Sequence, residues 1–126
     1  MASVVTAAAN DFTGAGANNV LVFTADATNG GLISRIRFKA AGTNVASVAR
    51  IFINNGSANT TAANNTFFGE LALPVTTANA AGTTGPDLEY VFPGAGLALN
   101  PGFRIYWGLG TAVAAGWMAT PIAGKY

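Results

Sequence analysis

The chain has 126 residues, and 51% of them are apolar, although 26 residues are alanine. The larger apolar side chains that remain suffice for one domain with a modest core. Only 9% of the residues are charged and the formal net charge is +1, which excludes the concentrated basic surface of a typical nucleic-acid-binding domain.

Two residue types with much of the chemistry of proteins are missing, because the sequence contains neither His nor Cys. This excludes a Cys/His metal site, a thiolate or Ser-His nucleophile, an imidazole pH switch and a disulfide framework. Any enzyme would have to work with five carboxylates, six cations and hydroxyl groups. We therefore expect no enzymatic activity and no cofactor.

The first residues predict neither export nor membrane insertion. Residues 1–9 lack the basic residues of a signal peptide, and no window approaches the roughly 18 apolar residues of a membrane span. We expect synthesis in the cytoplasm and no membrane contact.

Residues 1–17 are predicted as an extended N-terminal arm, because the small-residue stretch 14–19 separates them from the first strong strand. The arm carries Val4, Val5 and Phe12, three apolar side chains that need a place to be buried. Two interpretations are open. Residues 3–6 form an edge strand of their own domain, or the arm docks onto a neighbouring subunit.

Apolar residues then recur with a period of two, which is typical of half-buried strands. The pattern predicts strands over 20–24, 32–39, 45–53, 67–73, 87–92, 103–109 and 113–120. Four rows are expected to face the core: Leu32, Ser34, Ile36 and Phe38; Phe67, Gly69, Leu71 and Leu73; Leu88, Tyr90 and Phe92; and Phe103, Ile105, Trp107 and Leu109. The strand over 45–53 is expected to have apolar contacts on both faces.

The connections between these strands are of two lengths. Residues 41–44 and 110–111 are short enough for hairpins, whereas 54–66 and 74–86 are long enough to cross from one sheet to another. Short hairpins mixed with long crossings favour an all-β fold. We predict one domain over 1–126, an antiparallel β-sandwich of seven or eight strands of jelly-roll or Greek-key type.

A basic row lies on the outer side of the predicted strand 32–39, where Arg35, Arg37 and Lys39 alternate with apolar residues. One interpretation is a solvated face that guards against aggregation. The other is contact with an acidic protein surface. The carboxylates of Glu70, Asp87 and Glu89 are candidates to face this row, within the sheet or across a subunit boundary.

Two further functions use other residues. Tyr106 and Trp117 could stack on a sugar, which would make the chain a carbohydrate- or receptor-binding module. The competing interpretation places both Trp side chains in the core or in a subunit interface. Asp87 and Glu89 share one strand face like the carboxylate pair of a glycosidase, but no further ligand or catalytic group lies near them in the sequence.

The C-terminal third carries a resemblance to known proteins. Its motifs are Pro93-Gly94-Ala95-Gly96-Leu97-Ala98-Leu99, Phe103-Arg104-Ile105-Tyr106-Trp107-Gly108, Ala114-Ala115-Gly116-Trp117-Met118-Ala119-Thr120 and Gly124-Lys125-Tyr126. This ending resembles that of small virion proteins of tailed bacteriophages, the capsid decoration or cement proteins. The resemblance implies a small β-sandwich or jelly roll on the outside of the phage head.

The sequence therefore predicts a structural virion protein that stabilises contacts between capsid subunits. Its expected partners are the major capsid protein and further copies of itself, as a homotrimer, without direct contact to nucleic acid. The expected location is the capsid surface, after synthesis in the host bacterium. The expected partner-binding residues are Val4, Val5, Phe12, Arg35, Arg37 and Lys39.

Overall fold

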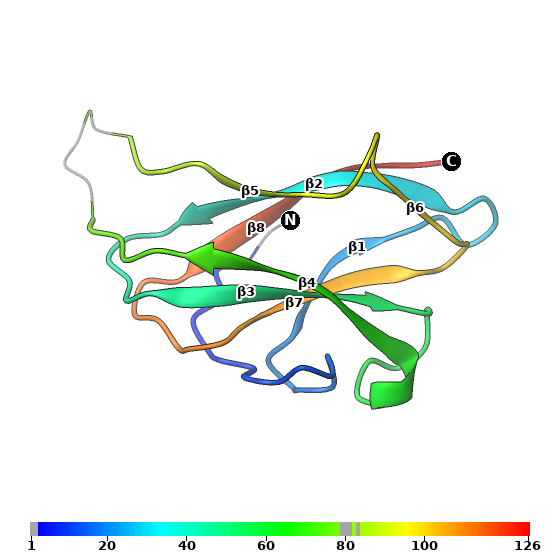
Figure 1. Ribbon diagram of the computed structural model, residues 1–126, viewed down its shortest axis with the longest axis horizontal. Coiled ribbons are helices and arrows are strands. Elements are labelled where there is room, and N and C mark those ends of the chain that lie inside the picture. The colour runs from blue at the N-terminus through cyan, green and yellow to red at the C-terminus, as the bar shows by residue number, and fades with distance from the viewer. Residues whose placement is uncertain (1–2, 79–81, 83) are drawn as a thin grey trace.

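The computed structural model describes residues 3–78, 82 and 84–126, which form two antiparallel sheets (Figure 1). The strands are β1 (Val20–Thr24), β2 (Gly31–Ala40), β3 (Ser47–Asn54), β4 (Asn65–Leu73), β5 (Leu88–Val91), β6 (Leu97–Leu99), β7 (Arg104–Leu109) and β8 (Trp117–Lys125), with a 3-10 turn η1 (Ala62–Asn64) before β4. Sheet I has the order β1-β7-β3-β4. In sheet II, β2 lies between β8 on one side and β5 followed by β6 on the other.

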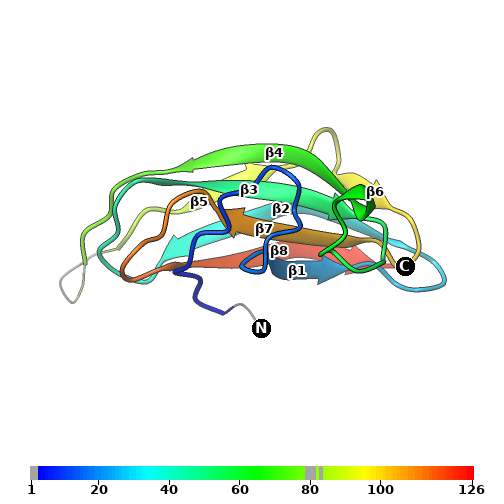
Figure 2. The ribbon, with the colours of Figure 1, turned by 90° about the horizontal axis from the view of Figure 1, so that it is seen from below.

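The two sheets pack face to face, and their edges meet in pairs. Strand β4 lies near β5 along one side of the sandwich, and β1 lies near β8 along the other (Figures 1 and 2). The predicted all-β sandwich is confirmed. The chain changes sheet at every connection except β3–β4 and β5–β6, which is the back-and-forth course of a jelly roll.

Three of the four expected connection types are wrong. Residues 41–46 and 110–116 cross between the sheets, whereas residues 55–64 join two hydrogen-bonded neighbours of one sheet, β3 and β4. These predictions used loop length alone. A short segment can still cross the sandwich when its backbone groups find hydrogen-bond partners inside the fold. The fourth expectation is confirmed, since the chain between β4 and β5 does pass from sheet I to sheet II.

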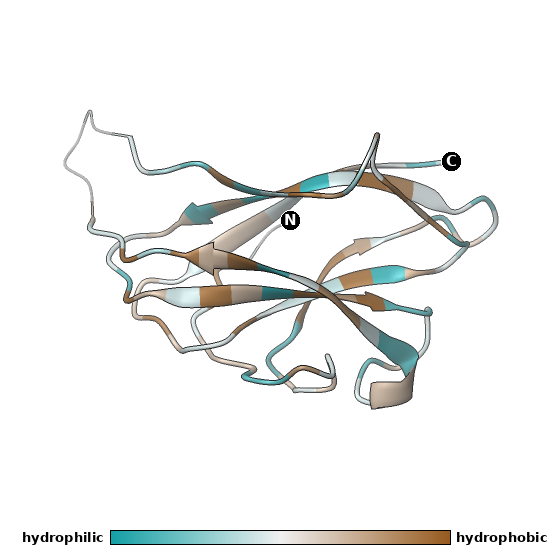
Figure 3. Ribbon diagram, viewed as in Figure 1, coloured by the Kyte–Doolittle hydropathy of each residue, from teal (hydrophilic) through white to brown (hydrophobic). Residues whose placement is uncertain are grey.

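The core lies between the sheets, and hydrophobic and hydrophilic residues alternate along the strands that enclose it (Figure 3). The predicted row on β7 is confirmed, with Ile105, Trp107 and Leu109 fully buried. The row on β5 is confirmed as well, because Leu88 and Tyr90 pack against the core and Phe92 is buried in it.

Two β-bulges shift the other predicted rows. A register shift between Ile33 and Arg35 puts Ile33 into the core, so that the inward side changes within β2. A second shift, opposite Ile51 and Phe52, leaves Phe67 on the outer side of β4 while Phe68 packs inward against Phe92. An extra residue in one strand shifts the alternation by one position, so the residues before it face the opposite side of the sheet from the one predicted.

The C-terminal strands also differ from the prediction. Strand β8 begins at Trp117 and continues to Lys125, whereas the alternation had predicted a strand over 113–120. The sequence pattern does not predict the short strand β6. Its three residues lie between the glycine segment 94–96 and the turn residues 100–102, and both segments indicate bends. Pro121 lies inside β8, which is possible because β8 is an edge strand.

One end of the sandwich is held together by Asn44, a residue that is 2% exposed. Its Oδ1 accepts hydrogen bonds from the backbone N–H groups of Ala115 and Gly116, at 3.0 and 2.7 Å. Its Nδ2 donates to Thr76 Oγ1 at 3.2 Å and to the carbonyl oxygen of Gly116 at 3.1 Å. The backbones of Asn44 and Thr76 exchange two further hydrogen bonds. Three sheet-to-sheet connections therefore meet at one amide.

Replacing this amide should destabilise the whole domain. We expect Asn44→Ala to lower the free energy of unfolding by about 2–4 kcal/mol, because several buried backbone groups lose their partner. Urea unfolding followed by circular dichroism measures the change. The matched control is Asn18→Ala, which removes one exposed hydrogen bond to the Ala8 carbonyl and should cost less than about 1 kcal/mol. Equal losses for the two variants would contradict the role of Asn44.

Candidate interaction surface

The N-terminal segment packs on its own domain in the single chain. Val5 is 6% exposed, and its backbone exchanges hydrogen bonds of 2.9 and 3.0 Å with Trp117 at the free edge of β8. The N–H groups of Ala9 and Asn10 then both donate to the carbonyl oxygen of Leu109 on β7. Val4 stays about half exposed. Of the two interpretations of the arm, the described residues show the intramolecular edge contact.

Phe12 belongs to an aromatic cluster on the outer face of sheet I. Its ring lies edge-on to Phe67 at 5.8 Å, and Phe67 lies 5.5 Å from Phe52 of β3. The guanidinium carbon of Arg50 is 4.0 Å from the centre of the Phe12 ring, a cation–π contact. Phe52 is buried although it points away from the core, so the expected apolar contacts on both faces of β3 are confirmed.

A loop built around Asp11 carries Phe12 across this face. The two carboxylate oxygens accept hydrogen bonds from the N–H groups of Thr13, Gly14 and Gly16 and from Asn19 Nδ2, at 2.7–3.1 Å. Gly14 has a φ of 74°, and a Cβ atom there would lie 3.0 Å from the Phe52 ring. Glycine is therefore required twice, for its dihedral angle and for the close approach. The chain's own N-terminal segment thus covers part of the outer face of sheet I, over β3 and β7 (Figure 2).

The outer face of sheet II carries the basic row, and its carboxylates come from Glu89 of β5 and from Asp87 directly before β5. Arg37 Nη2 lies 2.9 Å from Glu89, and Lys39 Nζ lies 2.7 Å from Asp87. Because Arg37 and Glu89 are partners in the β2–β5 register, these contacts form within the sheet, one of the two arrangements expected. Glu70 does not join them, since it pairs with Arg50 on sheet I.

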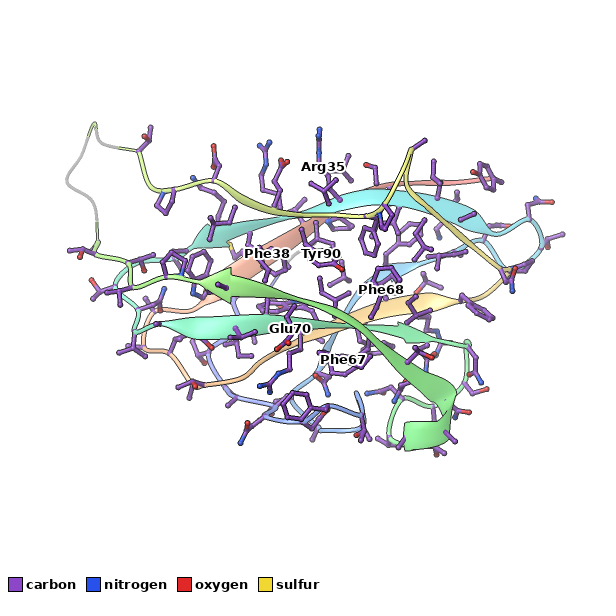
Figure 4. All side chains as sticks on the ribbon, viewed as in Figure 1. Arg35, Phe38, Phe67, Phe68, Glu70 and Tyr90 are labelled. Carbon is purple, nitrogen blue, oxygen red and sulfur yellow. The ribbon has the colours of Figure 1, made fainter. Side chains whose placement is uncertain are left out.

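Of the three cations in the basic row, Arg35 has the longest contact with a carboxylate. Its nearest described carboxylate is Glu89 at 3.7 Å, and Glu89 already accepts two hydrogen bonds from Arg37. In the sheet, Val91 of β5 and Ile122 of β8 flank Arg35, and they are 65% and 39% exposed. The side chain projects from β2 on the side away from sheet I (Figure 4). A cation with two exposed apolar neighbours therefore stands on an open sheet face.

A groove of about 380 Å³ lies between the edges of β1 and β8. Its walls include Phe23, Trp107 and Pro121. Trp117 turns its N–H and carbonyl toward this edge to bind Val5, and alternate residues of a strand point the same way. Pro121 therefore turns its nitrogen, which has no hydrogen, to the free edge. A strand added here would lack a donor.

The aromatic residues named for sugar stacking are divided between surface and core. Trp117 and Trp107 are both buried, at 0% and 1% exposure, so Trp117 cannot present its ring to a ligand. Tyr106 lies on the opposite face of β7 from Trp107 and is partly buried. The interpretation that both Trp side chains serve the core is confirmed.

No cluster of three or more acidic, His or Cys side chains suited to a metal ion occurs among the described residues. Within the same residues, no helix is long and apolar enough to cross a membrane.

Asp87 and Glu89 are each held by a cation of β2. The sequence prediction missed the apolar neighbours of Arg35, because Ile122 lay outside the predicted strand 113–120.

Comparison of the chain with protein-family models, with curated proteins and with solved structures gives no match.

Removing the Phe12 ring should loosen the N-terminal segment. We expect Phe12→Ala to speed the hydrogen exchange of the Ala9 and Asn10 amides by about threefold to tenfold. The N-terminal segment would lose its cation–π contact with Arg50 and would open more often. Exchange followed by NMR measures the effect. Val91→Ala removes an equally exposed apolar side chain from sheet II and should leave both amides unchanged. Unchanged exchange in Phe12→Ala would show that the ring does not hold the segment.

The Lys39–Asp87 pair should be visible in a titration. The hydrogen bond and the charge of Lys39 lower the pKa of the Asp87 carboxyl below its ordinary value. An acid with a lowered pKa contributes stability above its unfolded pKa, and this contribution is lost as the pH falls through the folded pKa. We expect Lys39→Gln to raise the pKa of Asp87 toward the ordinary value in an NMR titration. Arg104→Gln is the control, and an ordinary pKa in the unmodified protein would disprove the pair in solution.

Proposed function

We propose that this protein is a structural virion protein that binds the outside of a bacteriophage capsid and stabilises contacts between capsid subunits. The observation that carries the proposal is the difference between the two outer faces. The chain covers part of the outer face of sheet I with its own N-terminal segment. On sheet II, Arg35, Val91 and Ile122 remain exposed.

Such a face suits attachment of a small domain to a larger body. The exposed patch of Arg35, Val91 and Ile122 is small compared with the roughly 20–30 residues per side of a stable protein interface. Attachment through it would therefore be weak for one copy and strong for a symmetric oligomer, for which we propose a trimer. The jelly-roll course of the chain supports a virion role, because this architecture is frequent among viral capsid domains.

The test is addition of the purified chain to phage heads that were assembled without it. We expect saturable binding and a higher temperature of DNA release, because each copy bridges neighbouring subunits of the major capsid protein. Sedimentation of the heads measures binding, and DNA-dye fluorescence measures release. A heat-unfolded sample of the chain is the control. Absence of saturable binding would overturn the proposal.

The second candidate is a carbohydrate- or receptor-binding module of a tail fibre or adhesin. It is favoured by one observation, the exposed edge-to-face pair Phe12 and Phe67 beside Arg50 on sheet I. A glycan array separates the candidates. Sugar binding that is lost in Phe12→Ala, together with no binding to heads, would select this function over capsid decoration.

A further inference from the structure

We infer that the part of sheet II around Arg35 recognises a protein surface that presents a carboxylate beside an apolar side chain. This inference rests on the proposed function, and it names the contact face and the chemistry that the capsid must offer. Its basis is the juxtaposition of Arg35, the exposed side chains of Val91 and Ile122, and a shallow depression of about 210 Å³ next to them.

The charge pattern selects an acidic partner. The outer face carries three cations on β2 and two carboxylates near β5. Lys39 is paired at 2.7 Å and Arg37 at 2.9 Å, whereas the contact of Arg35 is 3.7 Å and uses an oxygen that Arg37 already occupies. The Arg35 side chain is 46% exposed. The surplus positive charge is thus located at one residue, and a single carboxylate on the partner would complement it.

The carboxylates also determine the direction from which that partner group approaches. Asp87 and Glu89 lie on the β5 side of the basic row and repel an incoming acid there. On the other side of Arg35 lies β8, with Ile122 directly opposite in the register. The partner carboxylate therefore meets Arg35 from the β8 side, where the sheet carries no acidic residue among those described.

The depression lies on the same side. It is lined by Leu32, Ser34, Ile122, Ala123 and Gly124. Gly124 has no Cβ, and an added one would meet no described atom within 4 Å, so the space above it is open. An apolar side chain of the partner can occupy the depression while a neighbouring carboxylate binds Arg35. The apolar contact and the exposed ion pair together would attract the partner and fix its position on the sheet.

The experiment measures binding of variants to phage heads that lack the protein. Arg35→Glu should weaken binding at least about tenfold, because a carboxylate then faces a carboxylate. Arg35→Gln should weaken it less and should remove most of the dependence on NaCl concentration. Ile122→Ser should weaken binding without changing the salt dependence.

Two controls separate this site from general attraction. Arg104→Glu makes the same charge change on β7 of sheet I and should leave binding within about twofold. Asp87→Asn removes an acid from the β5 side and should leave binding equal or make it tighter. Thermal unfolding of every variant, followed by circular dichroism, confirms that the sandwich is intact.

Selective loss in Arg35→Glu supports the inference. Unchanged binding in Arg35→Glu overturns it while the proposed function stands. Equal losses in Arg35→Glu and Arg104→Glu also overturn it, because attraction would then be diffuse. If the unmodified protein does not bind heads, the proposed function fails, and the inference that rests on it fails too.

Discussion

A chain that changes sheet repeatedly buries the backbone N–H and C=O groups of its connections, and these groups need hydrogen-bond partners. At one end of this sandwich the side chain of Asn44 provides such partners. Asn44 offers an acceptor and donors from one amide, and it binds groups in residues 42, 76, 115 and 116. Neither a carboxylate nor an aliphatic residue could supply both kinds of contact there. The connections that bring β3, β5 and β8 to their places therefore depend on this amide.

With the strands so placed, the chain treats its two outer faces differently. The outer face of sheet I carries an apolar residue of its own, Phe52, which lies against Gly14 of the loop around Asp11 and against the ring of Phe67. Sheet II has no such cover among the described residues. Instead it balances most of its charge internally, across β2 and β5. The domain thus has one face that its own N-terminal segment partly covers, and one face on which Arg35, Val91 and Ile122 stay exposed.

Period-two alternation sufficed to predict the sandwich, the core row of β7 and the placement of Tyr90 and Phe92. It failed where the period breaks, because a bulge is a property of two paired strands and leaves no mark in either strand alone. Ile33 and Phe67 were misplaced for that reason.

Pairing partners were equally out of reach of the sequence. The basic row was predicted, but its charge balance depends on β5 lying beside β2, which no local pattern encodes. The prediction could therefore name Arg35, Arg37 and Lys39 without showing that Arg35 differs from the others. Likewise the short segment 41–46 gave no sign of crossing the sandwich, because Asn44 finds its partners far along the chain.

Pro121 has a consequence for the proposed virion role, in which many copies of the chain would share one surface. On a crowded shell, identical edge strands would be held close together for the lifetime of the particle, which is the condition under which chains join into fibrils. A proline whose nitrogen points outward interrupts any such ladder in the middle of β8. Under the proposed role, neighbouring copies would therefore meet through side chains and not through a continued sheet.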